Sequence, residues 1–195
     1  MTQRRRSRPS RFAVVGTLAA AGILLVAGLA LPPMTGGQGS QSFARQVTEP
    51  RLFFLDIRGR VLSAATDGSD LRVLVDVLDT SPDGIAVDVE NGHVYWSNMG
   101  AAKADDGSIM RADLDGSNIT TIVPTGGTFT AKQLTIDHSN GKLYWSDREG
   151  MRVMRANLDG TGLETLVEIA SGDEARQNAA NWAVGVAVDV ERGHI

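Results

Sequence analysis

The sequence predicts an all-β fold, a β-propeller with about three blades' worth of strands, preceded by one N-terminal hydrophobic helix. The first observation behind this prediction is a repeated motif, DVENGHVYWSN at 88–98 and DHSNGKLYWSD at 137–147. The second is a further partial copy, DVERGHI at 189–195. The third is a recurring Asp-Gly pair, with its glycines at Gly68, Gly116 and Gly160. These glycines are 48 and 44 residues apart, a period typical of propeller blades.

The first 31 residues are interpreted as a targeting segment. MTQRRRSRPSR carries five arginines and no acidic residue, and FAVVGTLAAAGILLVAGLAL (12–31) is an uninterrupted apolar run of 20 residues. Such a run can span a bilayer as a helix, and Gly28 and Ala30 also fit a signal-peptide cleavage site. Residues 1–31 are therefore either a signal peptide or a transmembrane anchor. The basic flank predicts that the remainder is extracytoplasmic, membrane-anchored or secreted.

Residues 32–51 are predicted to be a flexible linker. Most of this stretch, MTGGQGSQSFARQVTEP at 34–50, is rich in Gly, Gln and Ser and has few apolar residues. Such a composition is typical of a flexible chain. The linker would separate the folded part, residues 52–195, from the membrane.

Composition excludes several classes of function. The chain has no cysteine, which excludes disulfides, thiolate zinc sites and a cysteine nucleophile. Of its 19 basic residues, five lie in the first eleven positions, and they face 23 acidic residues in the whole chain. The part after the targeting segment is thus clearly acidic, so no nucleic-acid partner is expected.

Each repeat contains short segments rich in Val, Ile, Leu and aromatic residues, which are predicted to be strands separated by turns. Asn91-Gly92 and Asn140-Gly141 lie between the first and second segments, where a tight hairpin needs residues that tolerate positive φ. The recurring Asp-Gly pairs separate the third and fourth segments in the same way. The repeats are expected at about 52–75, 84–123, 133–167 and 185–195.

The strands add up to three blades. The first repeat starts at LFFLD (52–56) and lacks an inner strand, whereas the last contributes one inner strand, VGVAVDV (184–190), so that three, four, four and one segments give 12 strands. Propellers usually have roughly four to eight blades, too many for this chain alone. Either the sequence is a fragment, or two chains self-associate head to tail to complete a six-bladed ring.

These repeats closely resemble the low-density lipoprotein receptor class B, or YWTD, repeat. YWSN (95–98) and YWSD (144–147) stand where the family has its naming motif, and the Asp, Asn-Gly, Tyr-Trp and Leu-Asp-Gly recur in the same order. The resemblance covers about residues 52–195. It implies a six-bladed, TolB-like β-propeller on a cell-surface or secreted protein that binds other proteins.

The recurring residues are predicted to build the scaffold. An Asp before a turn commonly caps the turn's N–H groups, although three carboxylates near one axis also suggest a metal or catalytic site. Adjacent Tyr and Trp face opposite sides of a strand and would pack between blades, with an exposed sugar-stacking platform as the alternative. The structural repeat residues are Asp88, Gly92, Tyr95, Trp96, Gly116, Asp137, Gly141, Tyr144, Trp145, Gly160 and Asp189. Arg111 and Arg155 are predicted to pair with an acid on the adjoining blade.

The candidate binding surface lies where the repeats differ. Three connections, 99–107, 124–133 and 168–183, are longer than a blade needs and are expected to open on one end of the propeller. Phe129 and Trp182 would be its aromatic anchors, or else they fill gaps between blades. The candidate partner-binding residues are Asp105, Asp106, Phe129, Lys132, Asp173, Glu174, Arg176 and Trp182, with Asn178 and Asn181 beside them.

The leading functional hypothesis is an extracytoplasmic protein-binding scaffold without catalysis, cofactor or metal. Its expected partners are an unidentified protein or peptide, the membrane through 12–31 if that segment is uncleaved, and a second copy of the chain. The alternative is a calcium-dependent hydrolase of the propeller lactonase kind, which SPDGIAVD (81–88) also resembles. Calcium needs roughly six to eight oxygen ligands, and no distinctive ligand set stands out in the sequence. Asn118-Ile119-Thr120 is an N-glycosylation sequon, meaningful in a eukaryotic secretory lumen.

Overall fold

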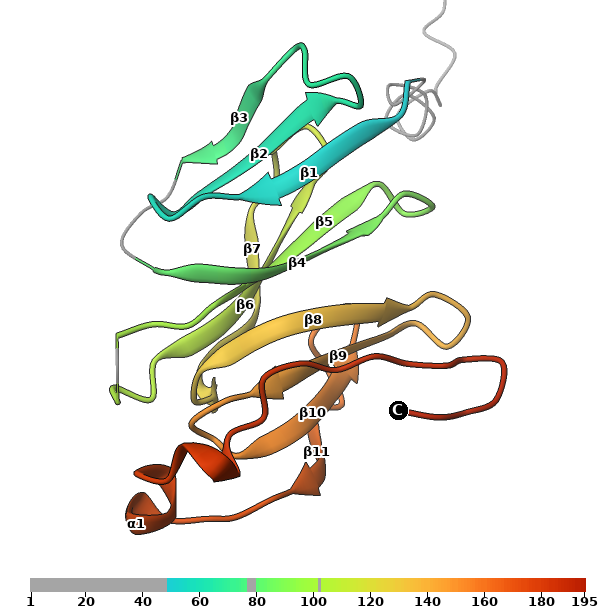
Figure 1. The fold of residues 1–195 in the computed structure, drawn as a ribbon. Helices are drawn as coiled ribbons and strands as arrows, with labels where there is room; N and C mark the ends of the chain where they lie inside the picture. Colours follow the sequence, from blue (N-terminus) through green and yellow to red (C-terminus); the bar gives the residue numbers. More distant parts are fainter. Residues whose placement is uncertain (1–48, 77–79, 102) are drawn as a thin grey trace, which may run out of the picture. The chain divides into compact units, whose positions relative to one another are not determined.

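The computed structural model describes residues 49–76, 80–101 and 103–195 (Figure 1). The expected targeting segment, and the linker up to residue 48, lie outside these residues. The described chain forms eleven β-strands in three antiparallel sheets, with one short helix and one 3-10 turn near its C-terminal end. No helix within it is long and apolar enough to cross a membrane. The all-β prediction is confirmed.

Each sheet is one blade, with strands in chain order. The first has three strands, β1 (Arg51–Leu55), β2 (Arg60–Ala65) and β3 (Arg72–Asp76). The second has four, β4 (Pro82–Asp88), β5 (His93–Asn98), β6 (Gly107–Asp113) and β7 (Thr120–Thr128). The third has β8 (Ala131–Asp137), β9 (Lys142–Asp147), β10 (Arg152–Asn157) and β11 (Glu164–Glu168), and is followed by α1 (Asp173–Arg176) and the 3-10 turn (Ala179–Asn181).

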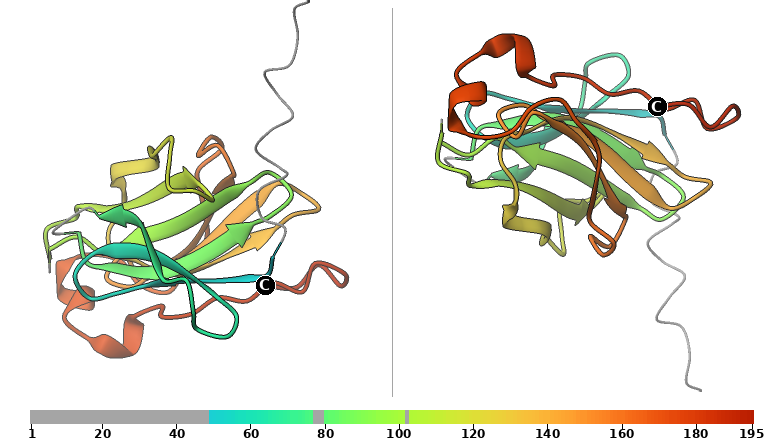
Figure 2. Two further views of the ribbon diagram at one scale, coloured as in Figure 1. Left: turned by 90° about the horizontal axis from the view of Figure 1, so that it is seen from above. Right: turned by 90° about the horizontal axis from the view of Figure 1, so that it is seen from below.

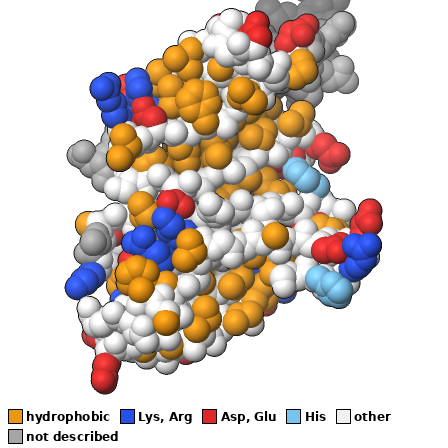
Figure 3. All heavy atoms as spheres, viewed as in Figure 1, with side chains coloured by type: hydrophobic (Ala, Val, Ile, Leu, Met, Phe, Trp, Pro, Cys, Tyr) orange, Lys and Arg blue, Asp and Glu red, His pale blue; other side chains and the backbone are white. Residues whose placement is uncertain are grey.

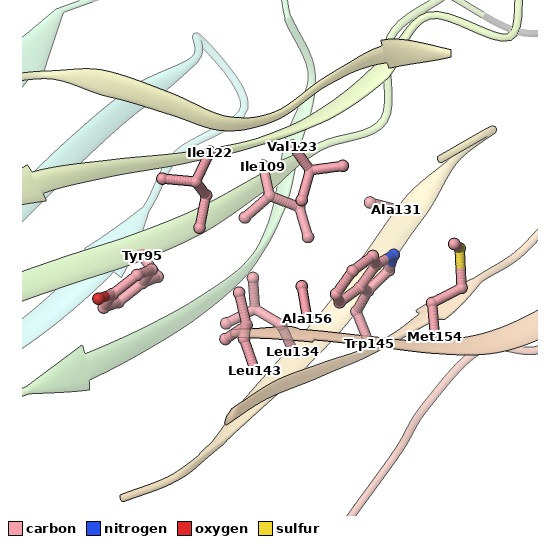
Figure 4. Packing of buried hydrophobic residues seen from close by; sticks show 10 residues of the cluster. All are labelled: Tyr95, Ile109, Ile122, Val123, Ala131, Leu134, Leu143, Trp145, Met154 and Ala156. Carbon is pink, nitrogen blue, oxygen red and sulfur yellow. The ribbon is translucent and has the colours of Figure 1, made fainter. Parts of the chain in front are cut away.

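The blades pack face to face (Figures 1 and 2). Tyr95, Trp96 and Trp145 of the Tyr-Trp pairs belong to the buried clusters of this packing. Trp96 lies between the first and second blades with Val61, Val75 and Val94. Its neighbour Tyr95 points to the other side of β5, into the cluster between the second and third blades that also holds Trp145 (Figure 4). A buried aromatic side chain removes on the order of 200 Å² from water, which is worth roughly 5 kcal/mol.

The inner turns differ from the predicted tight hairpin. Four residues, 89–92, connect β4 to β5, and of the Asn91-Gly92 pair only Gly92 has a positive φ, of 74°. Asp88 accepts hydrogen bonds from the backbone N–H (3.1 Å) and the side-chain amide (2.7 Å) of Asn91. Asp137 binds Asn140 in the same way, at 3.1 and 2.7 Å. The longer turn makes room for this cap.

Two expected strand boundaries are wrong. Most of the predicted connection at 124–133 is strand, because β7 continues to Thr128, opposite Gly107, and β8 begins at Ala131. The expected twelfth strand at 184–190 is not formed: one isolated bridge joins Asp189 to His194. A segment is a strand only when another strand pairs with it, and none of the described strands pairs with residues 184–188.

The outer turns, which join the third and fourth strands of the second and third blades, approach the backbone of the preceding blade at a glycine. A Cβ atom on Gly160 would lie 1.9 Å from the carbonyl oxygen of Ile122, and one on Gly116 would lie 2.2 Å from that of Leu74. Gly68, in the first blade, has nearly the same φ, 84° against 86° for Gly160, but no described atom lies within 4 Å of its Cβ position. At Gly116 and Gly160 the recurring glycine therefore serves two needs: it adopts the positive φ of the turn, and it leaves room for the backbone of the preceding blade.

This comparison predicts unequal costs for the same substitution. Gly160→Ala should lower the free energy of unfolding by about 3 kcal/mol or more, because it adds a steric conflict to the positive-φ strain. Gly68→Ala should cost about 1 kcal/mol, because it suffers the strain alone. Urea unfolding of both variants at neutral pH measures the difference. Equal costs would contradict the assignment of Gly160 to the contact between blades.

Candidate functional site

The strand connections divide between two ends of the blades. The turns between β4 and β5 and between β8 and β9 lie at one end, and the connections before β6 and after β11 lie at the other (Figures 1 and 2). We call the second end the loop face and define it by residues 99–101, 103–106, 129–130 and 169–183. Lys103 Nζ lies 3.5 Å from Gln177 Oε1, so the first and last of these segments touch.

Arg176 connects the C-terminal connection to the other segments. Its guanidinium carbon lies 4.0 Å above the ring of Phe129, a cation–π contact. Its Nε donates a 2.8 Å hydrogen bond to the carbonyl oxygen of Glu149, and Nη1 pairs with Asp173. The carbonyl oxygen of Arg176 accepts a 3.0 Å hydrogen bond from Trp182 Nε1. Phe129 and Trp182 are therefore both half-buried against the chain itself.

Arg148 and Glu149, in the turn between β9 and β10, contact Trp182 and Arg176 of the C-terminal connection. Arg148 binds both carboxylate oxygens of Glu149, at 2.8 and 2.6 Å, and its guanidinium carbon lies 5.1 Å above the ring of Trp182. Burial would raise the pKa of Glu149, but hydrogen bonds from Arg148 and Thr130 outweigh it, and the pKa is lowered. The carboxylate bond also raises the pKa of Arg148. We call Phe129, Arg148, Glu149, Arg176 and Trp182 the arginine–aromatic network.

Asp147, the acid of the YWSD motif, organises the backbone below this network. Its side chain is fully buried and accepts hydrogen bonds from the N–H groups of Phe129 (2.9 Å) and Thr130 (2.7 Å). Arg152 donates a third from Nε, at 2.8 Å, and forms an ion pair. With three charge-assisted hydrogen bonds, this buried carboxylate fixes the geometry of residues 129–130 and of the turn between β9 and β10, the two connections that carry part of the network.

The structure gives different surroundings to the eight predicted binding residues. Asp105, Asp173 and Glu174 are exposed, and Asp106 accepts a 2.9 Å hydrogen bond from the N–H of Ala101. Lys132 is committed to an ion pair with Asp83 between the inner strands of two blades, with Met99 Sδ 3.2 Å away. Phe129, Arg176 and Trp182 belong to the network. Of the predicted set, Asp105, Asp173 and Glu174 are the side chains most accessible to a partner.

A polar hollow of about 300 Å³ opens on the loop face. It lies beside Phe129 and Arg176, and its rim includes Asp105, Arg152 and Glu168. Basic side chains gather near this end among hydrophobic ones (Figure 3). The hollow is mainly polar and is lined by charges of both signs, a surface suited to polar side chains or backbone groups of another chain.

The recurring acids lie at the opposite end, in the turns after the inner strands. Asp88 is fully buried, and its Oδ1 lies 3.5 Å from Nδ1 of His138 in the neighbouring blade. Asp189 accepts bonds from the N–H and guanidinium of Arg192, at 3.2 and 2.8 Å. Within the described ranges, no three His, Asp or Glu side chains are grouped so that they could hold one metal ion.

The prediction for the recurring arginines is wrong for Arg155. It pairs with Glu164 of β11 in its own blade, at 2.6 Å, and its guanidinium carbon lies 5.7 Å above the ring of Tyr144. Arg155 lies directly opposite Glu164 in the register of the adjacent strands β10 and β11, which brings this acid within its reach. The network residues Arg148 and Glu149 were missed in the sequence, although they directly follow the YWSD motif.

Comparisons with known proteins agree on the fold. No protein-family model matches the chain. The curated protein named low-density lipoprotein receptor-related protein 1 from Pyricularia oryzae is 48% identical over 168 residues, which cover 76% of this chain and 53% of that protein. The 3-hydroxyacyl-CoA dehydrogenase-like protein LAM1 of Cochliobolus heterostrophus is 33% identical over 160 residues, covering 76% of this chain and 34% of that protein.

Among solved structures, the nidogen/laminin complex matches with a TM-score of 0.54 and 23% identity. The match covers 62% of this chain and 44% of the other. The chain thus spans about half the length of the first of these relatives, and less of the others. The comparisons support a propeller of receptor-type repeats.

The network predicts a specific dependence of stability on pH. Because the pKa of Glu149 is lower in the folded protein than its ordinary value of 4.5, the unfolded chain binds more protons between the two values. This stabilisation is present above pH 4.5 and is lost as the pH falls through the lowered pKa. Glu149→Gln should cost roughly 1–3 kcal/mol at pH 7 and should remove this part of the acid dependence.

Urea unfolding of the natural protein and of Glu149→Gln between pH 7 and pH 3 measures this acid dependence of stability. Glu164→Gln is the control, because Glu164 is exposed and its pair with Arg155 lies away from the loop face. Parallel stability curves for the natural protein and Glu149→Gln would contradict the prediction.

Proposed function

Because the chain is a β-propeller of the low-density lipoprotein receptor class B repeat type, we propose that its loop face binds a protein or peptide ligand outside the cytoplasm, without catalysis. Relatives named as receptor-related proteins support this proposal. In this proposal the blades are the scaffold, and the loop face supplies recognition.

The arginine–aromatic network is the observation that carries the proposal. Binding loops lose conformational entropy when a partner orders them, so loops that are already fixed bind more tightly. Here the longest connection, 169–183, is held by two cation–π contacts, by the Arg176 bond to Glu149 and by the Trp182 bond to Arg176. The exposed acids Asp105, Asp173 and Glu174 surround this fixed surface. A ligand with basic or amide donors facing these acids fits best.

Charge reversal tests the loop face. The double variant Asp105→Arg and Glu174→Arg should lose at least tenfold in ligand binding, because two exposed acids of the loop face become repulsive to a basic ligand. The matched control reverses two exposed acids of the turns, Glu90 and Glu191. Each immobilised protein is exposed to the extracellular proteins of the source, and the retained proteins are quantified by mass spectrometry.

Proteins retained by the natural chain and the control but lost from the loop-face variant would support the proposal. Equal retention by all three, or equal loss from both variants, would contradict it. Circular dichroism and the urea midpoint establish that the variants remain folded.

The proposal also includes self-association through the first blade. Leu52 and Phe54 of β1 are 50% and 38% exposed, whereas their equivalents Leu143 and Trp145 in the third blade are fully buried. A hollow of about 490 Å³ lies beside Leu52, lined by residues 49–53 and by Val87, Val89 and Leu114. Among the described strands β1 pairs with β2 alone, so it presents an unpaired edge beside an apolar face.

Residues 184–189 of a second copy fit this edge. In the second and third blades the final Asp of the inner strand lies opposite a basic residue, Asp88 opposite His93 and Asp137 opposite Lys142. The same register places Asp189 opposite Arg51 and Val188 opposite Leu52. The bridge between Asp189 and His194 must open, because Arg51 and Leu52 of the second copy take the place of His194 and Ile195.

Light scattering of residues 32–195 should therefore give twice the mass of one chain. Leu52→Lys should give a monomer, because it places a charge in the apolar contact. Ile119→Lys is the control, since Ile119 is similarly exposed, at 45%, but lies in the middle blade. A folded natural protein that is monomeric, or a Leu52→Lys variant that remains dimeric, would contradict this part of the proposal.

A further inference from the structure

Asn118 occupies an exposed position in the turn between β6 and β7. Its φ is 53°, and the equivalent residues of the other two blades, Asp70 and Gly162, have φ of 50° and 63°. Asn, Asp and Gly are the residues that tolerate this conformation, so the backbone explains the Asn. It does not explain Thr120, whose equivalents in the other blades are Arg72 and Glu164.

We propose that Asn118 is a site of N-glycosylation. This inference rests on the proposed function in one respect, because the modification requires that the chain enter a secretory lumen. Asn118-Ile119-Thr120 is the one Asn-X-Ser/Thr sequon in the 195 residues, so it is the single candidate acceptor of the chain.

The reaction takes its sugar from a lipid-linked oligosaccharyl diphosphate through a membrane transferase. The amide nitrogen of Asn118 forms a bond to C1 of the first sugar as the bond from C1 to the diphosphate oxygen breaks. The amide loses one proton to a transferase base, and the lipid diphosphate leaves with the bonding electrons. No oxidant or reductant takes part.

The folded turn can carry the product without rearrangement. Asn118 Nδ2 donates a 2.7 Å hydrogen bond to Asp113 Oδ2, and an amide nitrogen has two hydrogens. After glycosylation one N–H remains, so the bond to Asp113 can be kept while the sugar points to solvent. The Thr120 hydroxyl lies 3.2 Å from the carbonyl oxygen of Asn118, on the same exposed side of the turn.

The position of the turn leaves the loop face uncovered. The N–H of Leu114 donates a 3.0 Å hydrogen bond to the carbonyl oxygen of Gly92, so the turn after β6 lies beside the turn after β4. Both are at the end of the blades opposite the loop face (Figures 1 and 2). A bulky, hydrophilic glycan at Asn118 would therefore shield the turn end and leave the proposed binding surface free.

The test expresses the full chain in eukaryotic cells with two matched variants. Thr120→Ser keeps the sequon, and Thr120→Val removes the hydroxyl while it keeps Asn118 and a β-branched residue at the start of β7. Intact mass and peptide mapping are measured before and after peptide N-glycosidase, which releases the glycan and converts the linked Asn to Asp. Protection from added protease in sealed microsomes reports entry into the lumen separately.

We expect a glycan on the natural chain and on Thr120→Ser, and none on Thr120→Val, with all three chains protected in the lumen. Protection without any glycan on the natural chain would overturn the glycosylation site and leave the proposed location intact. A chain that is not protected and not glycosylated would overturn both. Glycan on Thr120→Val would show that the sequon does not direct the modification and would also overturn the site.

Discussion

The close contact between neighbouring blades is the constraint on which the rest of the structure depends. Gly160 lets the outer turn of the third blade reach the backbone of β7, and Gly84 lets β4 approach β8, where an added Cβ would lie 2.6 Å from the carbonyl oxygen of Lys132. The Ser97 hydroxyl strengthens the second contact by accepting from the N–H of Gly84 (2.8 Å) and donating to the carbonyl oxygen of Lys132 (2.6 Å). Tyr95, Trp96 and Trp145 are buried between the blades, so neighbouring blades share one apolar core.

This constraint decides where the sequence can vary. The strands, the buried aromatic rings and the turn glycines Gly116 and Gly160 contact a neighbouring blade, and a change in any of them would open a cavity or a clash. The connections of the loop face contact blades through few residues, mainly Asp147 and the arginine–aromatic network. Because Asp147 fixes the backbone at Phe129 and Thr130, the exposed part of these connections can change while its base stays in place. Recognition residues on a fixed base are the arrangement seen in other binding scaffolds.

Patterns among residues close in the sequence made the repeats and most strands predictable. Contacts between residues far apart in the sequence could not be predicted in this way. The period of the Asp-Gly pairs and the alternation around Tyr95 and Trp96 depend on neighbouring residues, so the repeats predicted the propeller and its strands. The prediction of a twelfth strand at 184–190 was wrong, because a strand forms only where a second strand pairs with it. At the candidate site the connections 99–107 and 168–183 could be foreseen from their length, whereas most of 124–133 is strand. The pairs of Arg148 with Trp182 and Arg176 with Phe129 join segments that no repeat relates. The ion pair of Lys132 could not be foreseen for the same reason, since its partner Asp83 belongs to another blade.

The charge arrangement of the loop face bears on the chemistry of a ligand. The cations there are largely neutralised within the chain, Arg148 by Glu149, Arg152 by Asp147 and Lys132 by Asp83. A partner would have to break one of these pairs to use the cation, at a cost of several kcal/mol for a buried acid left alone. Asp105 and Glu174 are exposed, so their carboxylates can bind a donor at little desolvation cost. The loop face therefore favours ligands that bring hydrogen-bond donors or positive charge, even though it contains more than one arginine.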